Sequence, residues 1–255
     1  MVLSMEKWVG KVAIVTGASS GIGAAIAEKL VEQGLTVVGV ARRVALIETQ
    51  AQKLSNKKGK LHAVKADLTV ETDVLDAFKW TLENLGPVHI LVNNAGILKE
   101  ELLTRGQSED WKRAFEVNVL ALCIATREAV KIMNAHNIDG HIIHINSILG
   151  HHVAIEPKLN VYPATKHAVT ALTETLRQEL NSLGSKIKVT SISPGLVVSE
   201  LTLLSKNISE ERRKNFEGRP ILQAEDIADG VVYALSTPPH VQVHELTIKP
   251  VGEPI

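Results

Sequence analysis

The stretch Thr16–Gly23, with the sequence TGASSGIG, constrains the fold of this chain more than any other. It follows the apolar run Val12–Val15 and opens an amphipathic run that ends near Gln33. This order predicts a strand, a tight glycine turn and a helix. Glycines permit such a turn and let a ligand approach the backbone closely. Because the N–H groups at a helix start favour phosphate, the stretch predicts dinucleotide binding, although a plain strand-to-helix turn is the alternative.

Strand and helix patterns alternate along the rest of the chain. Continuous β-branched runs in the early strands are typical of a parallel sheet covered on both faces. We therefore predict one α/β domain over residues 1–255, with a doubly wound parallel seven-stranded sheet of the Rossmann type. The expected strands are Val12–Thr16, Thr36–Ala41, Leu61–Lys65, Ile90–Asn93, His141–Asn146, Lys188–Ser193 and Gln242–Ile248. The expected helices are Ile22–Gln33, Ala45–Leu54, Thr72–Leu85, Glu109–Ala135, Tyr162–Leu183 and Asp226–Ser236.

Composition limits the classes of partner. The 28 Lys and Arg residues balance the 28 Asp and Glu residues, which argues against a nucleic-acid partner. One cysteine, Cys123, excludes an internal disulfide and favours a reducing compartment, so we expect a cytoplasmic protein. No apolar run approaches the ~18 residues of a membrane span, and the first ten residues lack a signal-peptide core. The ten histidines show no metal-ligand spacing, so no metal is expected.

The residues after the second expected strand indicate the type of dinucleotide. An acidic residue at the end of that strand would hold the ribose hydroxyls of the adenosine. Ala41 stands there instead, and Arg42 and Arg43 follow it. The planar fork of arginine suits a 2′-phosphate, so we predict NADP(H) as the cofactor. A solvated basic turn is the alternative.

Polar and small residues close the third and fourth expected strands. Asp67 and Leu68 follow the third, where a carboxylate could accept from the adenine amino group or form a helix cap with Thr69. The segment Asn93–Gly96 follows the fourth. Its small residues would admit a cofactor to the backbone, and its Asn side chains could tie neighbouring strands, although a plain turn has the same composition.

Four polar residues in the second half of the chain suggest chemistry. Asn118 lies inside the longest expected helix, where Asn is a poor helix former unless its amide is used. Ser147 follows the fifth strand. Tyr162 and Lys166 share one face of a helix whose first turn contains Pro163. An ammonium near a phenol is what an acid/base site needs.

Together these motifs resemble the short-chain dehydrogenase/reductase family. The resemblance spans nearly the whole chain and rests on Thr16–Gly23, Asp67, Asn93–Gly96, Asn118, Ser147, Tyr162-x3-Lys166 and Pro194-Gly195. Within the family, the segments Trp8–Val12, Gly39–Arg42 and Leu235–Pro238 are similar to the dehydrogenase/reductase member 11 type and to insect NADP-dependent farnesol dehydrogenases. Two positions depart from the family pattern. Ser20 stands where some NADP-dependent members have a basic residue, and Ser199 stands where the family often has threonine.

The resemblance implies hydride transfer between the nicotinamide and an alcohol or carbonyl carbon. Tyr162 would be the general acid/base, with a pKa lowered by Lys166 and the oxidised nicotinamide. Lys166 would also hold the nicotinamide ribose. Ser147 would bind the substrate oxygen, and Asn118 would hold a water of a proton relay. The expected cofactor-binding residues are Gly17, Ser19, Ser20, Gly21, Ile22, Gly23, Arg42, Arg43, Asp67, Leu68, Asn94, Ala95, Gly96, Tyr162, Lys166, Pro194, Gly195, Val197 and Ser199.

Apolar residues around the expected site favour a lipophilic substrate. Residues 196–222 are predicted to form a mobile lid whose apolar side includes Leu203, Leu204, Ile208 and Phe216. A second wall is expected from His151–Val153 and Ile155. A farnesol-like isoprenoid alcohol is favoured. The alternatives are a 3- or 17-ketosteroid or other carbonyl reductase, or a non-catalytic NADP(H)-binding sensor. The resemblance also implies a homodimer or homotetramer that pairs through the two longest helices.

Overall fold

A seven-stranded parallel sheet forms the centre of the computed structural model, which describes residues 3–154, 158–202 and 218–253. The strand order is β3-β2-β1-β4-β5-β6-β7, and every neighbouring pair is parallel. This confirms the predicted doubly wound, Rossmann-type sheet. The strands are β1 (Val12–Thr16), β2 (Thr36–Ala41), β3 (Lys60–Lys65), β4 (Val88–Asn93), β5 (His141–Ile145), β6 (Lys188–Pro194) and β7 (Glu245–Ile248).

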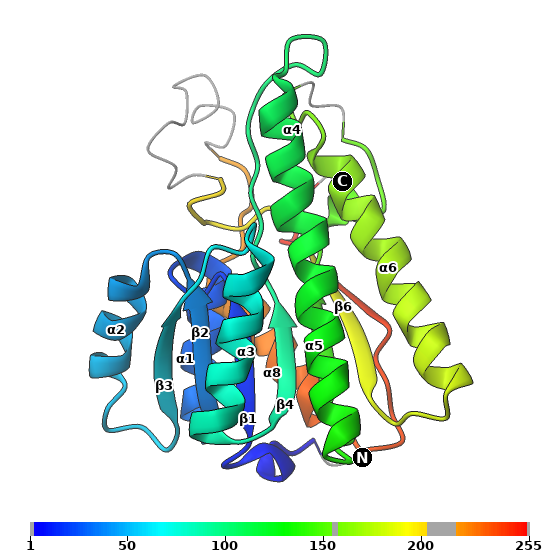
Figure 1. Ribbon diagram of the computed structural model, residues 1–255. Coiled ribbons are helices and arrows are strands. Elements are labelled where there is room, and N and C mark those ends of the chain that lie inside the picture. Colours follow the sequence, from blue (N-terminus) through cyan, green and yellow to red (C-terminus); the bar gives the residue numbers. More distant parts are fainter. Residues whose placement is uncertain (1–2, 155–157, 203–217, 254–255) are drawn as a thin grey trace.

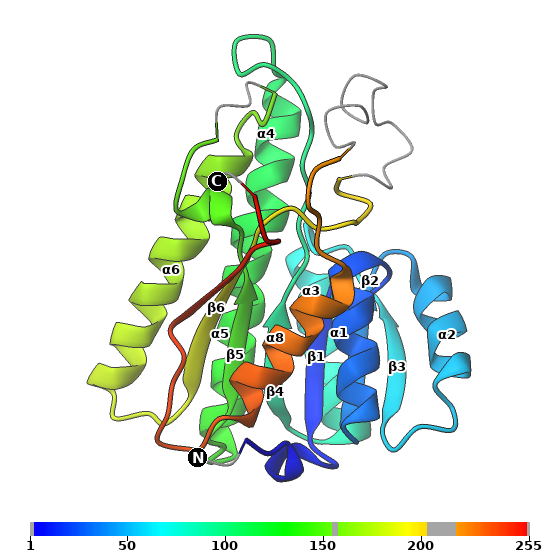
Figure 2. The same cartoon turned by 180° about the vertical axis from the view of Figure 1, so that it is seen from behind.

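Helices cover both faces of the sheet (Figure 1, Figure 2). One face carries α1 (Gly21–Glu32), α2 (Val44–Lys53) and α8 (Ala224–Ser236). The other carries α3 (Glu71–Leu85), α5 (Ala121–Ala135) and α6 (Tyr162–Ser182), while α4 (Ser108–Phe115) extends beyond the sheet in line with α5. Two short 3-10 turns, η1 (Glu6–Trp8) and η3 (Ile148–Gly150), lie before β1 and after β5. No helix in the described ranges is long and apolar enough to cross a membrane.

Two apolar layers hold the helices to the sheet. On the α1 and α8 face, side chains such as Ile26, Leu30 and Ile227 pack in one cluster. On the opposite face, Phe78 and Met133 belong to the second cluster. Each fully buried side chain of this size contributes about 1.5–3 kcal/mol. All of β1 is buried, which explains its continuous apolar sequence and fixes the strand end from which the glycine turn begins.

The prediction of one continuous helix over Glu109–Ala135 is wrong in its middle. There α4 passes through a π-helical turn, η2 (Glu116–Leu120), before α5 begins. Asn118 lies in this turn and is buried. Its side chain forms hydrogen bonds with other segments, described below, so the widened turn accompanies a residue that an ordinary helix accommodates poorly.

The ends of the predicted lid, residues 196–222, lie side by side. The Leu222 N–H donates to the Leu196 carbonyl and the Val198 N–H donates to the Leu222 carbonyl, each over 2.9 Å. Val197 and Leu222 form an isolated parallel bridge. Leu203, Leu204, Ile208 and Phe216, which we expected on the apolar side of the lid, lie outside the described residues.

Two histidines of β5, His141 and His144, are completely enclosed by the core. The His141 Nε2 atom lies 2.8 Å from the Thr190 hydroxyl, and the His144 Nδ1 atom lies 2.9 Å from the Thr173 hydroxyl. Burial lowers the pKa of both imidazoles to about 3, and nearby lysines, among them Lys166 at His144, add to this effect. Both rings are therefore neutral at physiological pH.

These histidines should make the protein sensitive to acid. Between pH 6.5 and 3 the unfolded chain binds protons that the folded chain excludes, so stability present above pH 6.5 is lost as the pH falls. Each ring contributes a slope of about 1.4 kcal/mol per pH unit inside this window. Urea unfolding at pH 7, 6 and 5 measures the slope. His144→Gln should flatten it, and His136→Gln, at an exposed position, should not; equal slopes for both variants would refute this explanation.

Candidate active site

A cleft of about 670 Å³ opens near the carboxyl ends of β1 and β4, where the strand order reverses. It brings together most of the residues that the sequence predicts to bind the cofactor. Those that line it are Gly17, Ser19, Ser20, Gly21, Ile22, Gly23, Arg42, Arg43, Asp67, Leu68, Asn94, Ala95, Gly96, Tyr162, Lys166 and Ser199. Pro194, Gly195 and Val197, also predicted, are not among its lining residues. The cleft is also lined by residues that were not predicted to bind the cofactor, namely Ala41, Ala66, Ile97–Glu100, Val117, Ile145, Asn146, Glu200 and Leu201. Glu200 and Leu201 belong to the predicted lid, residues 196–222.

The glycine turn presents a helix start to the cleft. Gly17 and Gly21 have φ angles of +69° and +55°, a region that favours glycine. A Cβ atom at Gly17 would lie 2.9 Å from the Ala95 Cα atom, so the close approach of the two loops needs glycine there. Among the described residues no side chain caps α1, and its first turn contains no acidic residue. Uncapped N–H groups at the start of α1 fit the pyrophosphate of a dinucleotide.

Asn94 joins the glycine turn to the end of β4. Its Nδ2 atom donates to the carbonyls of Thr16 and Gly17, at 2.9 and 3.3 Å. In return, the Thr16 hydroxyl accepts from the N–H groups of Asn94 and Ala95, at 3.0 and 3.2 Å. These four bonds hold the two loops that form the floor of the cleft.

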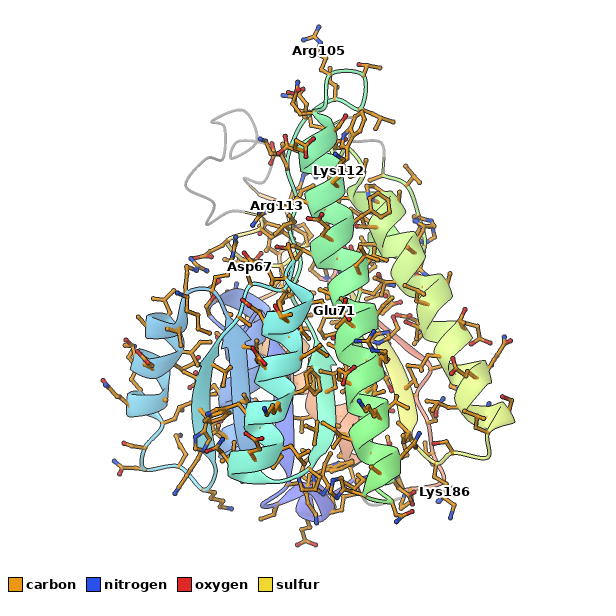
Figure 3. The ribbon with its side chains drawn as sticks, in the orientation of Figure 1. Asp67, Glu71, Arg105, Lys112, Arg113 and Lys186 are labelled. Carbon is orange, nitrogen blue, oxygen red and sulfur yellow. The ribbon has the colours of Figure 1, made fainter. Side chains whose placement is uncertain are left out.

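Asp67 lies at the end of β3 and lines the same cleft (Figure 3). Its Oδ1 atom accepts from the Thr69 N–H at 3.0 Å and from the Thr69 hydroxyl at 2.8 Å. These bonds lower the pKa of Asp67, and the charges of Arg42 and Arg113 lower it further. Asp67 is therefore a carboxylate held in a local turn, while α3 begins later, at Glu71.

The two arginines after β2 take different positions. Both line the cleft. Arg42 lies near enough to Asp67 to lower its pKa. Arg43 turns toward the glycine turn, where it donates to the hydroxyls of Ser19 and Ser20 and to the carboxylate of Glu200. The sequence predicts both arginines as ligands of the 2′-phosphate. In the structure, Arg42 lies near Asp67 and Arg43 is paired with Glu200.

Tyr162 and Lys166 lie on the first turns of α6 and are both buried, with 8% and 4% exposure. The Lys166 Nζ atom lies 5.8 Å from the centre of the Tyr162 ring and donates to the Ile145 carbonyl at 2.9 Å. Burial lowers the pKa of Lys166 to about 8. Burial raises the pKa of Tyr162 to about 12, against the opposing effect of a hydrogen bond with Ser147. In the chain alone, desolvation of the phenol outweighs the hydrogen bond. The predicted lowering of the phenol pKa depends on the oxidised nicotinamide as well as on Lys166, so it stays a prediction.

Ser147 stands between β5 and the turn η3. Its hydroxyl accepts from the Leu149 N–H at 3.1 Å, and its side chain hydrogen-bonds the Tyr162 phenol. Ser147 is also buried. The structure therefore places a serine hydroxyl, a phenol and an ammonium close to one another beside the cleft.

Asn118 links the loop after β4 to the start of α6. Its Oδ1 atom accepts from the Ile97 N–H at 2.8 Å, and its Nδ2 atom donates to the Ile97 carbonyl at 3.0 Å. Nδ2 also donates to the Thr165 hydroxyl at 3.0 Å, and that hydroxyl donates to the Tyr162 carbonyl at 2.7 Å. Protein groups thus engage the amide, and the proton relay through a water stays a prediction.

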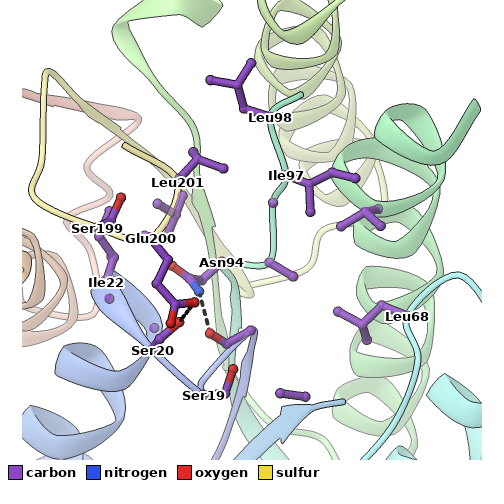
Figure 4. Close-up of a pocket in the computed structure, with 18 of the residues that line it drawn as sticks. Ser19, Ser20, Ile22, Leu68, Asn94, Ile97, Leu98, Ser199, Glu200 and Leu201 are labelled. Atoms are coloured by element: carbon purple, nitrogen blue, oxygen red, sulfur yellow. Dashed lines mark hydrogen bonds between the residues drawn. The ribbon is translucent and has the colours of Figure 1, made fainter. Parts of the chain in front are cut away.

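Part of the cleft lining is apolar. Ile97, Leu98 and Leu201 form this part (Figure 4). His151–Val153, expected as a second wall, are not among the lining residues, and the His151 Nε2 atom lies 2.9 Å from the Ser193 hydroxyl on β6. Ile155, the remaining member of that wall, lies outside the described residues. Across residues 3–154, 158–202 and 218–253, no three His, Cys, Asp or Glu side chains are grouped as metal ligands.

Comparisons with known proteins agree with this geometry. The family model described as short chain dehydrogenase matches residues 11–212. Farnesol dehydrogenase from Aedes aegypti is 50% identical over 98% of this chain and 99% of its own length. Dehydrogenase/reductase SDR family member 11 from Mus musculus is 47% identical over 96% of each chain. The alcohol dehydrogenase of Thermococcus sibiricus, solved in complex with 5-hydroxy-NADP, superimposes with a TM-score of 0.83 at 26% identity, covering 95% of this chain and 97% of that one.

Removing the Asn118 amide should destabilise the fold. Asn118→Ala deletes the bonds to Ile97 and Thr165 and leaves the Ile97 N–H without its acceptor. The expected loss in the free energy of unfolding is about 1–3 kcal/mol. Urea denaturation measures it, with Asn84→Ala as the matched control, because Asn84 donates its amide to the Trp80 carbonyl on an exposed helix face. Equal losses in the two variants would contradict the linking role of Asn118.

Proposed function

The chain belongs to the short-chain dehydrogenase/reductase family, and we propose that it is an NADP(H)-dependent oxidoreductase acting on the alcohol or carbonyl group of a lipophilic substrate. We favour a farnesol-like isoprenoid alcohol. The observation that carries the proposal is the juxtaposition of Ser147, Tyr162 and Lys166 beside a cleft that begins at an uncapped helix start. A non-catalytic sensor would need the dinucleotide cleft but not this polar group.

The residues present fit a dinucleotide. The N–H groups at the start of α1 would hold its pyrophosphate, and Arg42 and Arg43 would hold a 2′-phosphate. Asp67 and Leu68 would contact the adenine. The remaining contacts would come from Asn94, Ala95 and Gly96 toward the ribose and from Pro194, Gly195, Val197 and Ser199 toward the carboxamide. When bound, the nicotinamide would supply or accept the hydride.

Three side chains would manage the proton and the substrate oxygen. The Ser147 hydroxyl would hydrogen-bond that oxygen and steady developing charge. Tyr162 would donate the proton during carbonyl reduction and accept it during alcohol oxidation. Lys166, charged below about pH 8, would favour the phenolate that forms when Tyr162 gives up its proton. Its ammonium would also hold ribose hydroxyls.

The substrate proposal rests on apolar lining and on similarity. Ile97, Leu98 and Leu201 would contact hydrocarbon better than a sugar. The Aedes aegypti relative, 50% identical, carries the name farnesol dehydrogenase. A homodimer or homotetramer is part of the same proposal, and Phe115 and Leu120, exposed by 38% and 54% beside α5, support an apolar contact there. The single cysteine supports a cytoplasmic location.

Tyr162→Phe should abolish turnover, while the other expected cofactor-binding residues, which are unchanged, should still hold the cofactor. We expect wild-type protein to oxidise farnesol with NADP⁺ more efficiently than with NAD⁺, and the variant to lose about 10²- to 10⁴-fold in kcat/KM. Absorbance of the reduced cofactor at steady state measures the rate. Tyr233→Phe, at an exposed tyrosine on α8, is the matched control and should retain full activity.

The same assay separates the alternatives. Activity of wild-type protein only on steroid or other ketones with NADPH would move the substrate to the carbonyl reductase class. Tight NADPH binding without turnover of any alcohol or ketone would favour the sensor and overturn the proposal.

Carbonyl reduction should slow above about pH 8. Tyr162, with a pKa near 12, keeps its proton through this range, but Lys166 loses the charge that favours phenolate. The pH dependence of kcat/KM for ketone reduction measures the effect. Lys166→Arg, which stays charged, should lack the decline near pH 8, even if its overall rate is low. The same decline in both proteins would show that another group is responsible.

A further inference from the structure

A carboxylate from the loop after β6 lies against the glycine turn. Glu200 follows Ser199 and lines the dinucleotide cleft. Its Oε2 atom accepts from the Ser20 hydroxyl at 2.8 Å (Figure 4). Ser20 is the residue that precedes the first turn of α1. Glu200 therefore brings a negative charge to the part of the cleft that the fold otherwise prepares for phosphate.

Arg43 holds this carboxylate with both of its terminal nitrogens. Its Nη1 atom donates to Oε1 at 3.0 Å and its Nη2 atom donates to Oε2 at 2.5 Å. Nη2 also donates to the hydroxyls of Ser19 and Ser20, at 3.3 and 2.9 Å. Two guanidinium nitrogens and a serine hydroxyl thus surround one anionic group. This is the donor arrangement that suits a phosphate oxyanion.

We propose that Glu200 is a specificity-determining residue that competes with the 2′-phosphate of NADP(H) for Arg43, and so reduces the preference of the protein for NADP(H) over NAD(H). The inference rests on the proposed function, because it takes Arg43 as a phosphate ligand. A 2′-phosphate that uses the fork of Arg43 must displace a carboxylate that already uses both nitrogens. NAD(H) has no 2′-phosphate and needs no such exchange.

The size of the effect follows from the exposure of the pair. The Arg43 and Glu200 side chains are 51% and 45% exposed, so solvent screens their attraction. Exposed pairs of this kind change an equilibrium by about two- to fivefold. Glu200 would therefore adjust the preference between cofactors, while Arg42 remains beside Asp67 to bind phosphate in either case.

The test is the binding of NADPH and NADH to the protein without substrate, measured by isothermal titration calorimetry. Glu200→Gln keeps the shape of the side chain and removes its charge. We expect the ratio of the NADH Kd to the NADPH Kd to rise about two- to fivefold. The rise should come from a lower NADPH Kd, while the NADH Kd stays the same. An unchanged or smaller ratio would overturn the inference. In particular, weaker binding of both cofactors would show that Glu200 clasps the bound dinucleotide instead of competing with it.

A second pair of variants ties the effect to Arg43. In the background of Arg43→Ala, Glu200→Gln should leave the ratio of the two Kd values unchanged, because the contested cation is gone. A rise in that background would show that Glu200 acts through general repulsion or through another contact, and would overturn the assignment. Thermal unfolding of each variant checks that the fold is retained.

The wild-type measurement separates this inference from the proposed function. If wild-type protein binds NADH more tightly than NADPH, the proposed use of NADP(H) fails. If wild-type protein prefers NADPH but Glu200→Gln does not raise the preference, the proposed function stands and the inference alone fails.

Discussion

The close approach of the β1 and β4 loops is the constraint on which the cleft depends. Gly17 leaves no room for a side chain against Ala95, and Asn94 bonds across the gap to Thr16 and Gly17. The buried β1 strand fixes where this contact occurs. Because the strand order reverses at β1 and β4, the chain segments beyond this contact run to opposite faces of the sheet, and a crevice opens between them. The uncapped start of α1 and the buried residues Tyr162 and Lys166 of α6 both face that crevice.

A second link joins the cleft to the chemistry. The π-helical turn carries Asn118, which holds the Ile97 backbone on one side and the Thr165 hydroxyl on the other. Thr165 in turn holds the Tyr162 carbonyl. The loop after β4 and the helix that carries Tyr162 and Lys166 are thereby fixed relative to each other. An uninterrupted helix would not need a buried Asn. The Asn118 that is unusual in a predicted helix is therefore the same residue that links the Ile97 loop to α6.

The sequence predicted the sheet well because its local signals agree with the tertiary fold. β1 and β2 have the predicted bounds, since each is a buried apolar run with a clear turn after it. It failed over Glu109–Ala135, because a π turn depends on what Asn118 contacts and not on helical periodicity. It could not distinguish Arg42 from Arg43 or indicate Glu200, because the partner of Arg43 lies 157 residues away in the chain. The sequence placed Glu200 beside Ser199 inside the predicted lid, residues 196–222, but gave it no role of its own.

Burial disfavours charge on both Tyr162 and Lys166, and under the proposed function it would couple proton transfer to cofactor binding. Desolvation disfavours both the phenolate of Tyr162 and the ammonium of Lys166, since either charge is costly away from water. Of the two, the ammonium is the form that persists at neutral pH, because the pKa of Lys166 falls only to about 8. A second positive charge in the cleft would lower the cost of a phenolate and raise that of the ammonium. The oxidised nicotinamide carries such a charge and the reduced form does not. The site would therefore favour deprotonated Tyr162 when alcohol is to be oxidised and protonated Tyr162 when a carbonyl is to be reduced.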